Sequence, residues 1–302
     1  FYFTTGSTKW YTPDGIMAFD AGPGDEFDLV KTFGRGAGAC RATNYATKKI
    51  WDDPNDLRHK KYNFMYVTDL VYNNPAAKAG SYYGKPVQLK DNSGKLLTSD
   101  TLRTYFGWPH YKFYNPDPRY AQARGGAYDW YIFRLAETYL LRAEAYWWKG
   151  DIVDAMADVN AVRTRAGCAP YTDPAKFDIG TILDERCREL FYEEPRKTEL
   201  TRIAFIFAKT GKSYNGNTYS VANFSVKNFY YDRVMEKNEY YNKGFTAING
   251  QQFTMSPFHV LWPVPQVSIN SNTRGVINQN YGYDGYANNV PPLTTIDPAD
   301  DL

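Results

Sequence analysis

Cysteine and histidine are scarce in this sequence, and their spacing excludes several kinds of site. Three cysteines in 302 residues form no C-x-x-C pair, which argues against both a disulfide framework and a cysteine-based zinc site. The three histidines, His59, His110 and His259, lie far apart and show no H-x-x-x-H spacing. The sequence therefore predicts no metal site and no histidine-based catalytic triad.

Long apolar runs, an excess of one charge and catalytic motifs are also missing. No uninterrupted apolar segment is long enough to span a bilayer. With 35 Lys and Arg against 33 Asp and Glu, the net charge is +2, which argues against nucleic-acid binding and against electrostatic docking on an anionic membrane. No G-x-S-x-G segment and no marked acid–base pair is present. We therefore expect no enzymatic activity and no cofactor. A glycoside hydrolase, which needs only two suitably placed carboxylates, is the weaker alternative.

Aromatic residues, by contrast, are abundant. They make up 17% of the chain, with 27 Tyr, 18 Phe and 7 Trp. Tyr and Trp combine an apolar ring with a polar group, so they suit both a packed core and a wet recognition surface. Composition alone favours packing, and the aromatics of interest are those outside the helical stripes.

The pattern of turn residues and apolar stripes divides the chain into three regions. Residues 1–124 carry frequent Gly and Pro, which predicts loops with short strands and helices. Residues 125–210 are predicted to be helical, and residues 211–302 return to loops rich in Asn, Tyr, Gly and Pro. Apolar residues recur at helical spacing over Arg134–Trp148 and again over Asp151–Ala166. The short turn between these segments predicts an antiparallel helical hairpin.

Two further helices are expected in the central region. Apolar stripes predict one from about residue 179 to 193 and another around residues 200–207, ending before Gly211. Two helical hairpins in tandem are typical of tetratricopeptide-like repeats. The predicted fold is therefore mainly α: tetratricopeptide-like hairpins with long aromatic-rich loops and a few short strands.

Three segments carry a resemblance to a known family. Arg134–Gly167 contains R-L-A-E and V-N-A-V-R-T-R-A-G, Glu185–Arg202 begins E-R-C-R-E-L, and Leu261–Tyr283 contains L-W-P-V-P-Q and N-Q-N-Y-G-Y. In this order and spacing they resemble the SusD-like (RagB/SusD) family of outer-membrane nutrient-binding lipoproteins. Asp53–Arg58 adds a weaker similarity. The sequence departs from the family pattern at Lys197, where Trp is frequent.

The resemblance implies a location and a function. The chain is expected to be one SusD-like domain over residues 1–302, the C-terminal portion of a longer protein anchored in the outer membrane through a lipidated N-terminus that this chain lacks. The expected function is to bind oligosaccharide or polysaccharide and deliver it to a SusC-type TonB-dependent transporter. Two alternatives stay open: peptide binding for import, and a tetratricopeptide-like scaffold for protein interaction.

Sugars are bound by aromatic rings with polar side chains at their rim. Residues 1–124 are the expected ligand-facing region, and Trp10 is the first candidate because its polar, turn-prone surroundings predict an exposed indole. Around Trp262, the resemblance implies a buried strand end. The candidate ligand-binding residues are Trp10, Tyr11, Asp14, Arg41, Asn44, Tyr45, Trp51 and Trp108.

Overall fold

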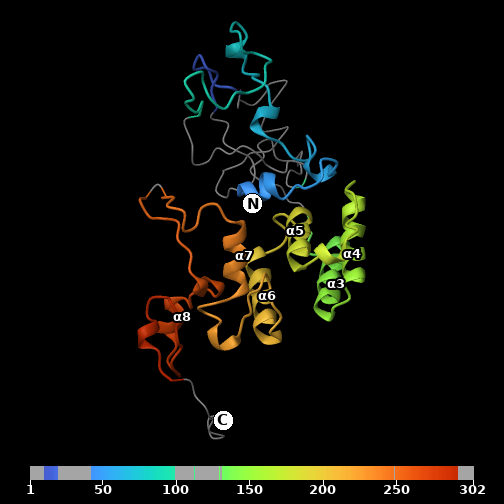
Figure 1. Ribbon diagram of the computed structural model, residues 1–302. Helices are drawn as coiled ribbons and strands as arrows, with labels where there is room; N and C mark the ends of the chain where they lie inside the picture. Colours follow the sequence, from blue (N-terminus) through green and yellow to red (C-terminus); the bar gives the residue numbers. More distant parts are fainter. Residues whose placement is uncertain are drawn as a thin grey trace. The chain divides into compact units, whose positions relative to one another are not determined.

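The computed structural model describes residues 10–19, 42–98, 112, 129, 131–247 and 249–291 (Figure 1). The chain forms two compact units, Phe1–Glu194 and Pro195–Leu302. Both contain helices joined by long loops. Within the described ranges, backbone pairing outside the helices is limited to isolated bridges, such as Trp10 with Thr98. The mainly α fold predicted from the sequence is confirmed, with these bridges in place of the expected short strands.

The first unit is built around a helical hairpin. Helix α3 (Leu135–Lys149) ends at Gly150, whose φ of 91° gives the left-handed conformation that glycine adopts without strain. Helix α4 (Ile152–Arg165) follows at once and packs along α3. The buried faces of the two helices contain small and branched residues that allow close approach. These residues are Ala136, Leu140 and Ala143 in α3, and Ala155, Val159 and Val162 in α4.

Helix α5 (Ile179–Glu189) packs against both helices of this hairpin. Its N-terminus is capped by Asp178, whose side chain accepts a hydrogen bond of 2.8 Å from the backbone N–H of Thr181. The helix ends about four residues before the point that the apolar stripe predicts. The chain turns after Glu189, and Tyr192 adopts a positive φ of 61°.

Residues 42–98 of the first unit fold as short helical turns rather than long elements. Several of these turns are capped by an Asp or Asn side chain, as in η2 and η4. Their bounds, with the turn that precedes α5, are η1 (Tyr45–Lys49), η2 (Leu57–His59), η3 (Val67–Asp69), η4 (Pro75–Ala77) and η5 (Pro174–Lys176).

The second unit centres on helices α6 (Arg196–Thr210) and α7 (Phe229–Lys237), which pack together. Phe207 of α6 and Phe229 of α7 are both fully buried, and their rings stack with centroids 4.6 Å apart. The remaining elements are short. They are η6 (Val221–Asn223), η7 (Pro257–Val260), α8 (Gln266–Ser271) and η8 (Tyr286–Asn288).

Two glycines are required where chain segments approach closely. Gly167 follows α4 with a φ of +84°, and a Cβ there would lie 3.2 Å from the carbonyl oxygen of Asn55. Gly282 has a φ of +86°, and a Cβ there would lie 2.4 Å from ring atoms of Phe258. Neither position accepts a larger residue without movement of the neighbouring segment.

Among the described residues, the helices are too short or too polar to qualify as candidate membrane spans.

Candidate ligand-binding surfaces

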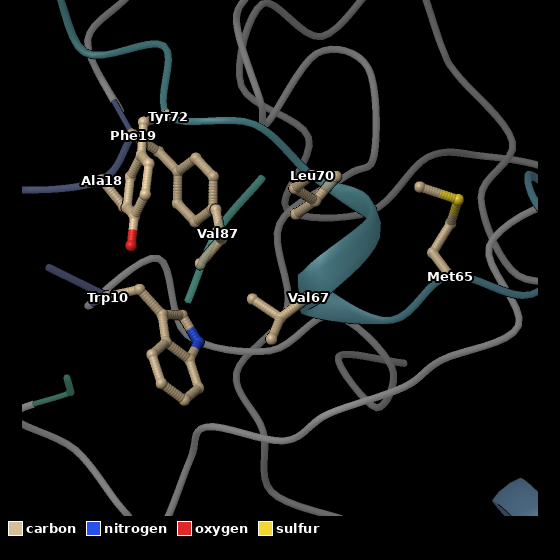
Figure 2. Close-up of a cluster of buried hydrophobic side chains, with 8 residues drawn as sticks. All are labelled: Trp10, Ala18, Phe19, Met65, Val67, Leu70, Tyr72 and Val87. Carbon is tan, nitrogen blue, oxygen red and sulfur yellow. The ribbon is translucent and has the colours of Figure 1, made fainter. Parts of the chain in front are cut away.

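The structure places Trp10 in a hydrophobic core and not on a surface. Its side chain is 1% exposed, and the expectation of an exposed indole is wrong. Figure 2 shows it gathered with apolar side chains from other segments of the first unit. The cluster consists of Trp10, Ala18, Phe19, Met65, Val67, Leu70, Tyr72 and Val87.

The burial of Trp10 has a cause that its local sequence does not contain. The backbone N–H of Ala18 donates to the carbonyl of Trp10 at 2.7 Å, which folds this segment back on itself. Ala18 and Phe19 thereby join the cluster, and its other apolar members come from residues 65–87, more than fifty positions away. Tyr11 is half-buried, and Asp14 is exposed and accepts a hydrogen bond from the hydroxyl of Thr12. Both residues therefore follow a core residue in the sequence.

Two other candidates, Arg41 and Trp108, lie outside the described residues.

Three candidates, Asn44, Tyr45 and Trp51, lie in one short described segment. Asn44 is exposed at the start of η1, and Tyr45 donates its hydroxyl hydrogen to the carboxylate of Asp184 on α5. Trp51 is half-buried, and its indole N–H donates to the carbonyl of Ala46 at 3.0 Å. The helical turn therefore fixes the orientation of the indole. We call residues 44–51 the Trp51 segment.

The indole of Trp51 is supported by a stack of aromatic rings. His59 lies against it with ring centroids 4.5 Å apart and planes 15° from parallel. Phe64, which is 2% exposed, packs next to His59 at 4.7 Å. A ring held on one side by a stack and on its edge by a hydrogen bond loses little freedom when a ligand stacks on it.

His59 is held in its neutral form. Its Nε2 lies 3.0 Å from the carbonyl oxygen of Thr47, so Nε2 carries the proton and donates it. The hydroxyl of Tyr66 donates to the same carbonyl at 2.7 Å. Burial lowers the pKa of His59, outweighing the hydrogen bond to Thr47 and the charge of Asp56. An uncharged ring of fixed tautomer therefore backs the indole.

A buried network of charges anchors the chain next to this segment. Arg58 contacts Asp56 at 2.7 Å, Glu185 at 2.8 Å and Glu189 at 3.0 Å. Burial opposes ionisation of Glu189, but the hydrogen bond from Arg134 and the surrounding arginine charges prevail and lower its pKa. These carboxylates serve to bind the N-terminal loops to α5.

The second unit exposes aromatic residues that were not among the sequence candidates. Tyr240 and Tyr241 are each 38% exposed, Phe245 is 52% exposed and Phe253 is 41% exposed. All four lie in the loop that follows α7, orange in Figure 1. The sequence contains one local signal of this surface, a Tyr-Tyr pair between Asn238 and Asn242 in a polar stretch.

Trp262 is also exposed, at 67%, and it follows η7 outside any strand. The implied buried strand end is therefore wrong. The ammonium group of Lys197 lies 4.6 Å from the Trp262 ring centroid and 4.8 Å from that of Tyr230. The same group donates to the carbonyls of His259 at 2.6 Å and Val260 at 3.1 Å. Lys197 thus joins α6 to η7.

Comparison with known proteins decides the family. The model of the SusD family matches residues 7–283. This chain belongs to the SusD family. It is 32% identical, over 152 residues, to the starch-binding protein SusD of Bacteroides thetaiotaomicron, an alignment that covers 50% of this chain and 21% of that protein.

A crystal structure of a SusD superfamily protein from Bacteroides fragilis is also similar. The match has 20% sequence identity and a TM-score of 0.46, and it covers 93% of this chain and 48% of that one. The chain thus spans less than half the length of either relative.

Proposed function

We propose that this SusD-family chain binds oligosaccharide or polysaccharide at the bacterial outer membrane, as part of a lipid-anchored protein, and passes it to a SusC-type TonB-dependent transporter. The support at the family level is the match over residues 7–283 and the similarity to a protein named for starch binding. In this proposal the chain recognises the glycan and does not cleave it.

The observation that carries the proposal is the fixed, half-buried indole of Trp51. The ring stacks on His59 at 4.5 Å and is oriented by the carbonyl of Ala46. Asn44, exposed in the same segment, offers an amide that both donates and accepts hydrogen bonds. The guanidinium carbon of Arg58 lies 6.0 Å from the centroid of the Trp51 ring. An aromatic face with hydrogen-bonding groups near it matches the C–H face and hydroxyl rim of a pyranose.

The carboxylates beside the Trp51 segment support binding over hydrolysis. Asp52 accepts a hydrogen bond of 3.0 Å from the hydroxyl of Tyr171 and lies 3.2 Å from Arg163. Asp56 is 1% exposed and contacts Arg58. A glycosidase places one carboxyl group on each side of the scissile bond, free to exchange protons or attack. Asp56 is instead buried and paired with arginine, and Asp52, whose side chain is 41% exposed, is paired with Arg163 and Tyr171.

Affinity gel electrophoresis tests the proposal directly. The chain is run through native gels containing starch, pullulan, dextran, xylan or mannan, and at least one polysaccharide should retard it. Trp51→Ala should weaken that retardation about tenfold in apparent Kd, since stacking on one ring contributes about 1–1.5 kcal/mol. Tyr83→Ala is the matched control, because Tyr83 is 40% exposed but lies outside the Trp51 segment.

Two results would reject the proposal. One is unchanged mobility of the wild-type chain in every gel. The other is release of reducing ends from a retained polysaccharide, which would make the chain an enzyme. A thermal melt of each variant shows whether a loss of retardation reflects lost binding or lost folding.

A further inference from the structure

We infer that the unit Pro195–Leu302 carries a second glycan-binding surface, on the loop that follows α7. This surface is formed by Tyr240, Tyr241, Phe245 and Phe253, and we call the described residues of 238–256 the aromatic hairpin. Its ligand is a pyranose-containing oligosaccharide or polysaccharide. The inference goes beyond the proposed function because the Trp51 segment belongs to the other unit.

The four rings form one connected group. The Tyr240 ring centroid lies 5.8 Å from that of Phe245 and 6.5 Å from that of Phe253. The ring centroid of Tyr241 lies 6.4 Å from that of Phe253. The rings meet at steep angles, between 56° and 75°. Such edge-to-face contacts leave ring surface accessible, in agreement with exposed fractions of 38–52%.

The backbone beneath these rings is held by a ladder of hydrogen bonds. Asn242 N–H donates to the carbonyl of Phe253 at 2.8 Å, and Phe253 N–H donates to the carbonyl of Phe245 at 2.8 Å. The side chain of Asn242 also bonds both backbone groups of Met255, at 2.9 and 3.0 Å. Asn238 accepts from the N–H of Tyr240 at 2.6 Å. The hairpin therefore presents its rings on an ordered support.

Packing does not explain why these rings are placed outward. Phe229 and Tyr230, in the adjacent helix α7, are 0% and 7% exposed, so the unit buries aromatic residues elsewhere. Apolar surface left in water forgoes about 25 cal/mol per Å² of stabilisation. Four neighbouring rings that are exposed in this way are typical of a binding surface.

The polar residues of the hairpin favour a sugar over a charged or purely apolar ligand. Asn249, Gln251 and Gln252 are all exposed, and each amide both donates and accepts hydrogen bonds, as sugar hydroxyls do. Between residues 238 and 256 the charged residues of the sequence are Glu239 and Lys243, one of each sign. A membrane surface would call for a basic face. Exposed aromatic rings in a loop that also exposes neutral amides suit a pyranose.

The test uses the full chain and the same panel of polysaccharide gels. The double variant Phe245→Ala/Phe253→Ala should weaken retardation by about fivefold to tenfold in apparent Kd, because it removes two stacking faces. Val267→Ala is the matched control, since Val267 is 78% exposed in the same unit but outside the hairpin. It should migrate as the wild type does.

The outcomes separate this inference from the proposed function. Each of the two variants should still show some retardation on its own. Combining the hairpin variant with Trp51→Ala should remove this residual retardation. If the hairpin variant is retarded as strongly as the wild type, the second surface is rejected, while a loss with Trp51→Ala alone would still support the first. If the double alanine variant melts early, Phe245→Leu replaces it. This substitution keeps an apolar side chain without a flat face, and it should still weaken retardation.

Discussion

Arg58 and Glu185 are 127 positions apart, and the guanidinium of one lies 2.8 Å from the carboxylate of the other. Glu185 is 0% exposed, and it is also contacted by Arg163 at 3.3 Å and Arg188 at 2.9 Å. Asp53–Arg58 and the start of the segment Glu185–Arg202 therefore meet in one buried network of the first unit.

Removal of Arg58 should destabilise the first unit strongly. Arg58→Met leaves Asp56 without its guanidinium and weakens the compensation of Glu185, and loss of one partner of a buried ion pair costs roughly 2–4 kcal/mol. Arg165 is the matched control, because it contacts Glu189 at 2.6 Å but is 59% exposed. Arg165→Met should cost less than about 1 kcal/mol. Urea denaturation measures both, and equal losses would contradict this account.

Trp10 should behave as a core residue. Trp10→Ala should lower the free energy of unfolding by about 3–5 kcal/mol, because it leaves a cavity next to Val67 and Tyr72. Tyr83→Ala, at a side chain that is 40% exposed, should change it by less than about 1 kcal/mol. Calorimetry on both variants gives the comparison. A Trp10→Ala variant as stable as the wild type would show that the indole is not buried in solution.

Stability should fall as the pH drops through the range of histidine titration. Burial lowers the pKa of His59 and of His259 below the usual 6.5. Below pH 6.5 the unfolded chain therefore binds more protons than the folded one, and acid favours unfolding. The melting temperature should decrease between pH 7.5 and 5.5, above the range of the carboxylates.

The variant His59→Phe isolates one of these contributions. It keeps an aromatic ring against Trp51 but removes the titrating group. The decrease in melting temperature between pH 7.5 and 5.5 should be smaller in this variant, because His259 alone remains of the two. An identical decrease in both proteins would mean that His59 does not titrate differently on folding.

Gly282 and Gly285 form a matched pair in the second unit. Both have left-handed φ angles, +86° and +90°, but a Cβ meets Phe258 at 2.4 Å only at Gly282, with nothing within 4 Å at Gly285. Gly285→Ala should cost about 1 kcal/mol from backbone strain. Gly282→Ala should cost a further 1–3 kcal/mol, roughly, from overpacking. Thermal melts of the two variants should therefore differ clearly, and coincident melts would exclude the steric effect.

The helical hairpin could be predicted from sequence because its determinants are local. Apolar spacing and Gly150 place the helices at Arg134–Trp148 and Asp151–Ala166, and the structure has them at Leu135–Lys149 and Ile152–Arg165. The predicted end of α5 is less accurate, since the apolar stripe continues past Glu189 into a turn. An apolar stripe indicates which residues are buried, and the residues of a turn can be buried as well.

The candidate site was harder to predict, because burial of loop residues depends on distant segments. Nothing next to Trp10 in the sequence reveals the apolar residues 65–87 that cover it. Trp51 was named as a candidate, but its support by His59 follows from the path of the chain through η2. A ligand role for Tyr11, Asp14, Asn44, Tyr45 and Trp51 stays a prediction.

The path of the first unit also determines the order in which it can fold. Helices α3 and α4 meet through the tight turn at Gly150, whereas Arg58 reaches Glu189 across 131 positions. Contacts of long sequence separation require closure of a large loop and form late. We expect Arg58→Met to accelerate unfolding while leaving the refolding rate nearly unchanged. In stopped-flow measurements, a slower refolding phase would instead place this contact in the folding nucleus. If Arg58→Met leaves refolding unchanged, the loops of residues 42–98 are the last part of the first unit to become protected from proteases, and the first to be lost.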